Sequence, residues 1–210
     1  MSDSRQHTRP PAVVVETRGP AAILRLDRPR ERNPLSASTL DELERALDSL
    51  APRTGLRAII FTGTGDAFAS GADIRELRSL APGAAAEFAR RGQRLTQKIS
   101  DAAALTVAAV GGYCMGGGLD LALACDLRVA SRSSTFAHPG ARLGIITGWG
   151  GTQRLPRLVG DARALEMFLT ARRVSGAEAL EIGLVNRLCD DPLDCALKLV
   201  AGWNGKGGGG

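Results

Sequence analysis

Two short, uninterrupted apolar runs constrain what this chain can fold into. They are "LRAIIFTG" at 56–63, which ends at Gly63, and "LTVAAVGGY" at 105–113, whose apolar part ends before Gly111. Strands that alternate apolar and polar residues have one face in water, whereas continuous apolar strands are typical of parallel sheets covered by helices on both faces. A helical pattern follows each run, so the sequence predicts crossover units and a parallel sheet. The predicted fold class is α/β.

Other segments extend the same alternation. The stretches 12–18 and 21–29 favour two strands joined in a hairpin at 18–20, and the apolar spacing over 36–51 predicts an amphipathic helix. Ser38 stands three residues before Asp41 in a capping pattern for that helix. Further helices are predicted over 73–81, 84–100, 161–171 and 175–183, another helix begins at 152–154, and strands are predicted over 126–131 and 184–188.

Length and composition indicate one domain. A chain of 210 residues is long enough for one substantial core. We expect residues 1–11 to form a flexible N-terminal tail, residues 12–200 to form the domain, and the Gly-rich residues 201–210 to form a disordered tail.

Charge and targeting signals narrow the function classes. The net charge is +5, but the 27 basic residues are spread along the chain without the dense block that marks a nucleic-acid surface. A phosphorylated small ligand is also compatible with this modest positive charge. No apolar run approaches the ~20 residues that cross a bilayer, and the N-terminus lacks a signal-peptide pattern. We expect a cytoplasmic protein without a membrane partner.

The four cysteines show no metal-binding or redox spacing. Cys114, Cys125, Cys189 and Cys195 form no C-x-x-C pair, so we expect reduced thiols and no zinc or other metal site.

Glycine-bearing turns precede two of the predicted helices. "GYCMGGGLDLALACD" at 112–126 has three consecutive glycines before an apolar run, and "FASGADIREL" at 68–77 repeats the strand–turn–helix arrangement. The glycines could serve close packing or a tight turn alone. Alternatively, the two helix starts could each aim a backbone N–H at one ligand oxygen, which is what a two-donor oxyanion hole requires.

These two motifs and "GIITGWGGTQRLPRLVG" at 144–160 resemble the crotonase superfamily, that is, enoyl-CoA hydratases, isomerases and their relatives. The resemblance covers roughly residues 12–200, including "LDRPRERNPLS" at 26–36. It implies a spiral of ββα units that binds an acyl-CoA thioester. Relatives generally continue with helices that cover the acyl pocket, and we expect that C-terminal segment to be missing here.

The resemblance also implies a set of site residues. The backbone N–H groups of Ala72 and Gly117 are expected to bind the thioester oxygen, and the segment 144–160 to form part of the site wall and subunit contacts. The residues expected along the acyl-CoA are Arg30, Arg32, Pro34, Ser70, Gly71, Ala72, Asp73, Ile74, Arg75, Tyr113, Gly116, Gly117, Pro139 and Gly140.

Some of these residues have a purely structural alternative. Arg30 and Arg32 could pair with CoA phosphates or be solvated loop charges. For Asp73 we favour the role of a helix N-terminal acid, and for Tyr113 that of a packing residue.

The acid–base groups depart from the family pattern. Family hydratases carry two glutamates, whereas this chain has Asp120 at the first position and Gly140 at the second. General acid–base catalysis typically contributes 10²–10⁴-fold, and glycine cannot transfer a proton. His138 is the nearest candidate to replace the second carboxylate, with a packed structural histidine as the alternative.

The predicted function is therefore an acyl-CoA enzyme of the enoyl-CoA hydratase/isomerase type. A decarboxylase of malonyl-type thioesters and a non-catalytic acyl-CoA-binding paralogue are the alternatives. The resemblance implies no separate cofactor, because coenzyme A is part of the substrate. It also implies a homo-oligomer, a trimer or hexamer, weakened by the missing C-terminal helices.

Overall fold

The large sheet has the parallel core that the apolar runs predict. The computed structural model describes residues 10–81 and 83–203. Six strands lie in the order β1 (Val13–Arg18), β2 (Ala21–Leu26), β4 (Ala58–Gly63), β7 (Leu105–Val110), β9 (Leu127–Ala130) and β12 (Arg187–Leu188). The first two strands form the expected antiparallel hairpin, and the other neighbours pair in parallel. The predicted strand 184–188 is shorter than expected.

A second, smaller sheet consists of strands too short for a sequence pattern to reveal. Its order is β11 (Val174–Ser175), β10 (Thr135–Ala137), β8 (Tyr113–Met115) and β5 (Ala67–Ala69), and β3 (Pro34–Leu35) pairs separately with β6 (Gly71–Ala72). Successive strands alternate between the sheets, as β4 and β5, β7 and β8, and β9 and β10 do. A helix follows each pair, which confirms the predicted spiral of ββα units.

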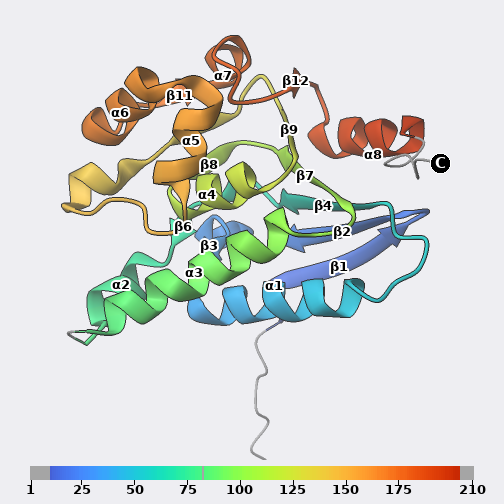
Figure 1. The fold of residues 1–210 in the computed structure, drawn as a ribbon, viewed down its shortest axis with the longest axis horizontal. Helices are drawn as coiled ribbons and strands as arrows, with labels where there is room; N and C mark the ends of the chain where they lie inside the picture. Colours follow the sequence, from blue (N-terminus) through green and yellow to red (C-terminus); the bar gives the residue numbers. More distant parts are fainter. Residues whose placement is uncertain (1–9, 82, 204–210) are drawn as a thin grey trace, which may run out of the picture.

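The predicted helices are present with small shifts of their ends (Figure 1). They are α1 (Ala37–Leu50), α2 (Ile74–Ser79), α3 (Ala84–Ser100), α4 (Gly117–Ala124), α5 (Gly151–Val159), α6 (Asp161–Thr170) and α7 (Gly176–Glu181), joined by the unpredicted α8 (Pro192–Gly202) and the 3-10 turns η1 (Pro29–Glu31) and η2 (Pro139–Leu143). The predicted cap of α1 is wrong. Ser36 is the N-cap and accepts from the Thr39 N–H, whereas Ser38 lies in the first turn.

Both faces of the large sheet are buried, which explains its uninterrupted apolar strands. On one face Ile23, Ile60 and Val107 pack with Ala196 and Val200 of α8. The main core lies on the other face, toward α1, α3 and α4. Figure 1 shows α1 and α8 on opposite sides of this sheet.

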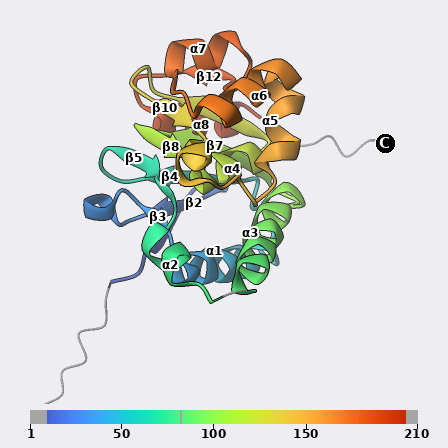
Figure 2. The ribbon, with the colours of Figure 1, turned by 90° about the vertical axis from the view of Figure 1, so that its left-hand side faces the viewer.

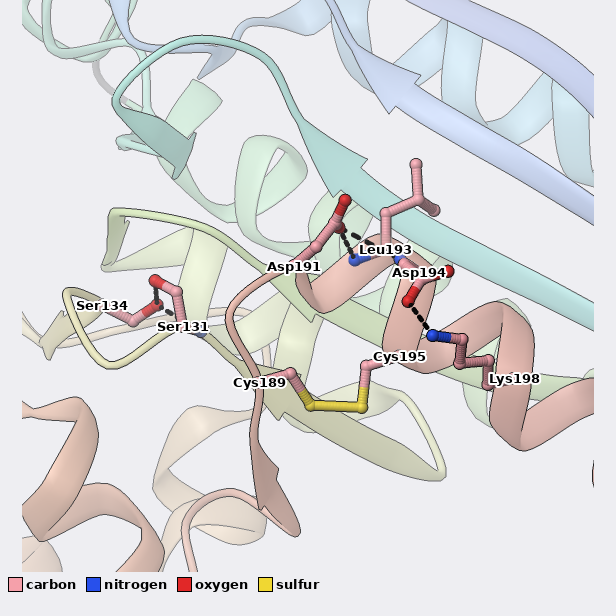
Figure 3. The surroundings of a disulfide bond; sticks show 8 residues. All are labelled: Ser131, Ser134, Cys189, Asp191, Leu193, Asp194, Cys195 and Lys198. Carbon is pink, nitrogen blue, oxygen red and sulfur yellow. Dashed lines mark hydrogen bonds and ion pairs between the residues drawn. A yellow bond between two sulfur atoms is a disulfide. The ribbon is translucent and has the colours of Figure 1, made fainter.

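The expectation of four reduced cysteines is wrong for one pair. Cys189 and Cys195 form a disulfide with their Cα atoms 6.3 Å apart (Figure 3). The chain turns from β12 into α8 within six residues, with Asp191 capping α8 by accepting from the Leu193 and Asp194 N–H groups. This turn brings the two sulfurs together without a C-x-x-C spacing. Cys114 and Cys125 are buried free thiols.

The predicted tails lie largely outside the described residues. Residues 1–9 and 204–210 are outside the described residues. The predicted start of the C-terminal tail at 201 is wrong, because Ala201 and Gly202 are the last two residues of α8. Within residues 10–81 and 83–203, no helix is long and apolar enough to cross a membrane.

Candidate active site

A cavity of about 240 Å³ opens where the strands of the small sheet end. Its walls come from α2, α3, the start of α4, η2 and the loop between η2 and α5. Figure 2 shows α2, α3 and α4 on this side of the molecule. Elements distant in sequence therefore converge on one apolar hollow.

The two glycine turns meet at this cavity. Strands β5 and β8 are parallel neighbours, so the turns that follow them lie side by side. Gly71 has φ +97°, and a Cβ there would fall 2.8 Å from the Met115 carbonyl oxygen and 3.1 Å from the Gly117 nitrogen. Both the backbone conformation and the close approach therefore require glycine at 71.

The Gly116–Gly118 run has two geometric reasons. Gly116 has φ +51°, and a Cβ on Gly118 would fall 2.6 Å from the Ala69 carbonyl oxygen. Gly117 is the first residue of α4, where a backbone N–H has no acceptor within the helix. The run thus serves turn and packing, and it also leaves a helix-start N–H at the cavity.

A carboxyl and an imidazole lie buried beside these turns. Asp120, in the first turn of α4, is 1% exposed and accepts a hydrogen bond from the Thr147 hydroxyl at Oδ2. Its Oδ1 lies 3.6 Å from Nε2 of His138, which is 3% exposed. Asp120 Oδ1 and both ring nitrogens of His138 have no hydrogen-bond partner among the described residues. Both side chains line the cavity, and these unpartnered polar atoms are themselves almost fully buried.

Burial moves the two pKa values in opposite directions. Burial raises the pKa of Asp120 to about 7, against the lowering effect of the Thr147 hydroxyl and the Arg154 charge. Burial lowers the pKa of His138 to about 4. Near neutral pH, Asp120 is therefore present both protonated and ionised, whereas the imidazole is neutral.

These opposite shifts predict how stability depends on pH. The folded pKa of Asp120 is raised from 3.8, so its contribution to the free energy of unfolding is fully present below pH 3.8 and is lost as the pH rises toward about 7. The folded pKa of His138 is lowered from 6.5, so its contribution is fully present above pH 6.5 and is lost as the pH falls toward about 4. Between these limits the two slopes cancel.

Single substitutions should expose each slope. Relative to the unsubstituted chain, Asp120→Asn should lose stability as the pH falls from 6.5 to about 4, and His138→Gln should lose it as the pH rises over the same interval. Each slope should approach about 1.4 kcal/mol per pH unit. Urea unfolding at a series of pH values measures both, and slopes of the same sign in the two variants would contradict the assignment.

The structure gives a physical reason for glycine at 140. The Ile145 N–H donates to the Gly140 carbonyl oxygen and closes the loop, with Gly144 in the left-handed conformation. A Cβ on Gly140 would fall 2.6 Å from the Ile145 carbonyl oxygen. This loop has no room for a carboxylate side chain at 140.

Ten of the predicted site residues line the cavity together. They are Ser70, Gly71, Ala72, Ile74, Gly116, Gly117, Asp120, His138, Pro139 and Gly140. The residues that do not line it are Arg30, Arg32, Pro34, Asp73, Arg75 and Tyr113.

The residues outside the cavity have other contacts. Asp73 caps α2 and pairs with Arg75, which supports its structural alternative. The Arg32 guanidinium carbon lies 5.1 Å from the ring centre of Tyr113, and Arg32 also pairs with Asp66. Roles of these groups toward CoA stay predictions.

Sequence reasoning missed most of the apolar wall. Leu77, Ala85, Phe88 and Ala89 line it from α2 and α3, and Leu143, Ile145, Ile146, Thr147, Gly148 and Trp149 from the η2–α5 side. The resemblance assigned 144–160 to the wall without distinguishing its residues. No local pattern links Thr147 to Asp120, 27 residues away.

The fold and the converging turns define a crotonase-like α/β protein. The chain belongs to the enoyl-CoA hydratase/isomerase family, whose model matches residues 16–207.

Similar proteins and structures agree with this family. A crotonyl-CoA hydratase of Syntrophomonas wolfei is 38% identical over 192 residues, covering 90% of this chain and 74% of that protein. A short-chain-enoyl-CoA hydratase of Clostridium acetobutylicum is 36% identical, covering 85% and 69%. The crystal structure of an enoyl-CoA hydratase from Bacillus anthracis matches with a TM-score of 0.87 and 32% identity, covering 90% of this chain and 75% of that one.

Proposed function

We propose that this protein adds water to a 2-enoyl-CoA thioester, with Asp120 as the acid–base group. The observation that carries the proposal is the buried Asp120 carboxyl, which lines the same cavity as Ala72 and Gly117 and has one oxygen, Oδ1, without a hydrogen-bond partner among the described residues. A pKa of about 7 suits a group that must both take and give a proton near neutral pH. The activities named for the relatives from Syntrophomonas and Clostridium are of this kind.

In the proposed reaction, the N–H groups of Ala72 and Gly117 bind the thioester oxygen. Ionised Asp120 takes a proton from water while the water oxygen bonds to C3, and the electron pair of the double bond moves toward the thioester oxygen as an enolate. The protonated Asp120 then gives its proton to C2, and the carbonyl re-forms. Donors fixed where this charge develops are worth a few kcal/mol each.

His138 is proposed as the second polar group at the reacting water. Its Nε2 is 3.6 Å from Asp120 Oδ1, longer than a direct hydrogen bond, and its ring is neutral at working pH. A neutral imidazole can accept a hydrogen bond from water without adding charge to the cavity. Its ring also lies 5.0 Å from that of Phe168, so packing is the competing role.

Gly140 favours a second candidate, decarboxylation of a malonyl-type thioester. Loss of CO₂ forms the enolate directly and needs fewer acid–base groups, and the loop around Gly140 leaves no room for a carboxylate. A non-catalytic acyl-CoA binder is the third candidate. Three further proposals hold for each of these candidates. Arg30 and Arg32 pair with the CoA phosphates, and residues 12–200 form one domain. The protein is a cytoplasmic homo-oligomer.

The purified protein incubated with 2-enoyl-, 3-enoyl-, 3-hydroxyacyl- and malonyl-type CoA thioesters tests the three candidates. Mass spectrometry should show a water adduct of the 2-enoyl thioester, and chromatography should separate isomers of equal mass. Loss of CO₂ from the malonyl-type thioester would favour the decarboxylase instead. Saturable binding without a chemical change in any thioester would support the non-catalytic acyl-CoA binder.

A further inference from the structure

The carboxyl of Asp120 is held asymmetrically. The Thr147 hydroxyl donates to Oδ2, whereas Oδ1 has no hydrogen-bond partner among the described residues and lies on the side of His138. Thr147 stands in the loop between η2 and α5 and itself lines the cavity. One carboxyl oxygen is therefore bound to the loop, and the other has no side-chain hydrogen bond.

Gly151 lies against the same group of side chains. A Cβ on Gly151 would collide with Asp120 Oδ1, and it would lie 2.8 Å from the Thr147 methyl carbon Cγ2 and 3.1 Å from His138 Cε1. Three side chains thus meet where residue 151 has none. The Thr147 side chain acts here in two separable ways, through its hydroxyl and through its methyl group.

We propose that Thr147 is a positioning residue that binds Asp120 Oδ2 and thereby presents Oδ1 to the reacting water. This inference rests on the proposed acid–base role of Asp120. A hydrogen bond to the ionised carboxyl also favours that form, so Thr147 opposes the rise in pKa that burial causes. The titratable and charged groups that face Asp120 are the neutral His138, Arg154 of α5 and the Cys114 thiol of β8. The backbone N–H groups of Trp149 and Gly151 also lower the pKa of Asp120, and neither Thr147 variant removes them.

Two variants separate the hydroxyl from the methyl group. Thr147→Val keeps the methyl that packs at Gly151 and removes the donor, whereas Thr147→Ser keeps the donor and removes the methyl. Losing a hydrogen bond to a charged group corresponds to an upward shift of about one to two pH units in the Asp120 titration for Thr147→Val. Thr147→Ser should leave the midpoint unchanged.

The titration is measured without reference to activity, by carbon NMR of the Asp120 carboxyl in selectively labelled protein, with circular dichroism to confirm folding. The pH dependence of kcat should shift by the same amount, and turnover at pH 7 should be about tenfold lower in Thr147→Val than in Thr147→Ser. An unchanged midpoint in Thr147→Val, or equal shifts in both variants, would overturn the inference. If no thioester is turned over, the proposed function fails while the carboxyl titration still decides the role of Thr147.

Discussion

Asp120→Asn should lower kcat for hydration by about 10²–10⁴-fold, because the amide keeps the shape of the carboxyl and cannot carry the proton. The residual rate should lose the pH dependence near 7 that the carboxyl of Asp120 gives the unsubstituted protein. Binding of the thioester should change little, since the loss falls on the chemical step. Steady-state kinetics from pH 5 to 9 measures these quantities together.

An exposed aspartate gives the matched control. Asp194 of α8 is exposed and pairs with Lys198, and α8 covers the face of the large sheet opposite α4, so Asp194→Asn removes one negative charge on the other side of the sheet from the cavity. It should leave kcat and its pH profile unchanged. Equal activity in Asp120→Asn and the unsubstituted protein would remove Asp120 from the mechanism.

Gly71→Ala should reduce turnover by about 10²–10³-fold, the loss seen when one oxyanion donor is removed. The new methyl would fall 2.8 Å from the Met115 carbonyl oxygen and 3.1 Å from the Gly117 nitrogen, so the two turns must move apart. Displacing either turn misplaces the N–H groups proposed to bind the thioester oxygen. A positive φ of +97° adds backbone strain of about 1–3 kcal/mol to the variant.

A second glycine, Gly55, provides a control that separates backbone strain from the collision between the two turns. Gly55 has φ +80° and nothing within 4 Å of a Cβ position, so Gly55→Ala carries a similar conformational penalty without a collision. Thermal denaturation should show both variants destabilised, and only Gly71→Ala should lose kcat beyond its loss of folded protein. Parallel losses in the two variants would contradict the role of the paired turns.

The large sheet could be predicted because its central strands are continuous apolar segments. Residues 58–63 and 105–110 are apolar on both faces, and the helices between them have amphipathic spacing. The small sheet could not, since strands of two or three residues such as β6 and β10 carry no periodicity. Their existence depends on pairing with strands from distant parts of the chain.

The candidate site was predictable where chemistry is local to a motif. The glycine turns and Asp120 belong to recognisable segments, and ten predicted residues line one cavity. The Thr147 contact and the apolar wall from α3 arise only when the chain folds. The disulfide was missed for a related reason, because the turn from β12 into α8 and not the cysteine spacing brings its sulfurs together.

The parallel pairing of β5 and β8 sets the distance between the two glycine turns that follow them. Neighbouring strands lie about 4.8 Å apart, and the two glycine turns continue these two strands. Two N–H donors that each stand about 2.9 Å from a single oxygen, at an angle of about 110°, are separated by about the same 4.8 Å. The repeat distance of the sheet thus matches the separation that the two N–H groups proposed for the thioester oxygen require, and this separation is a property of the main chain.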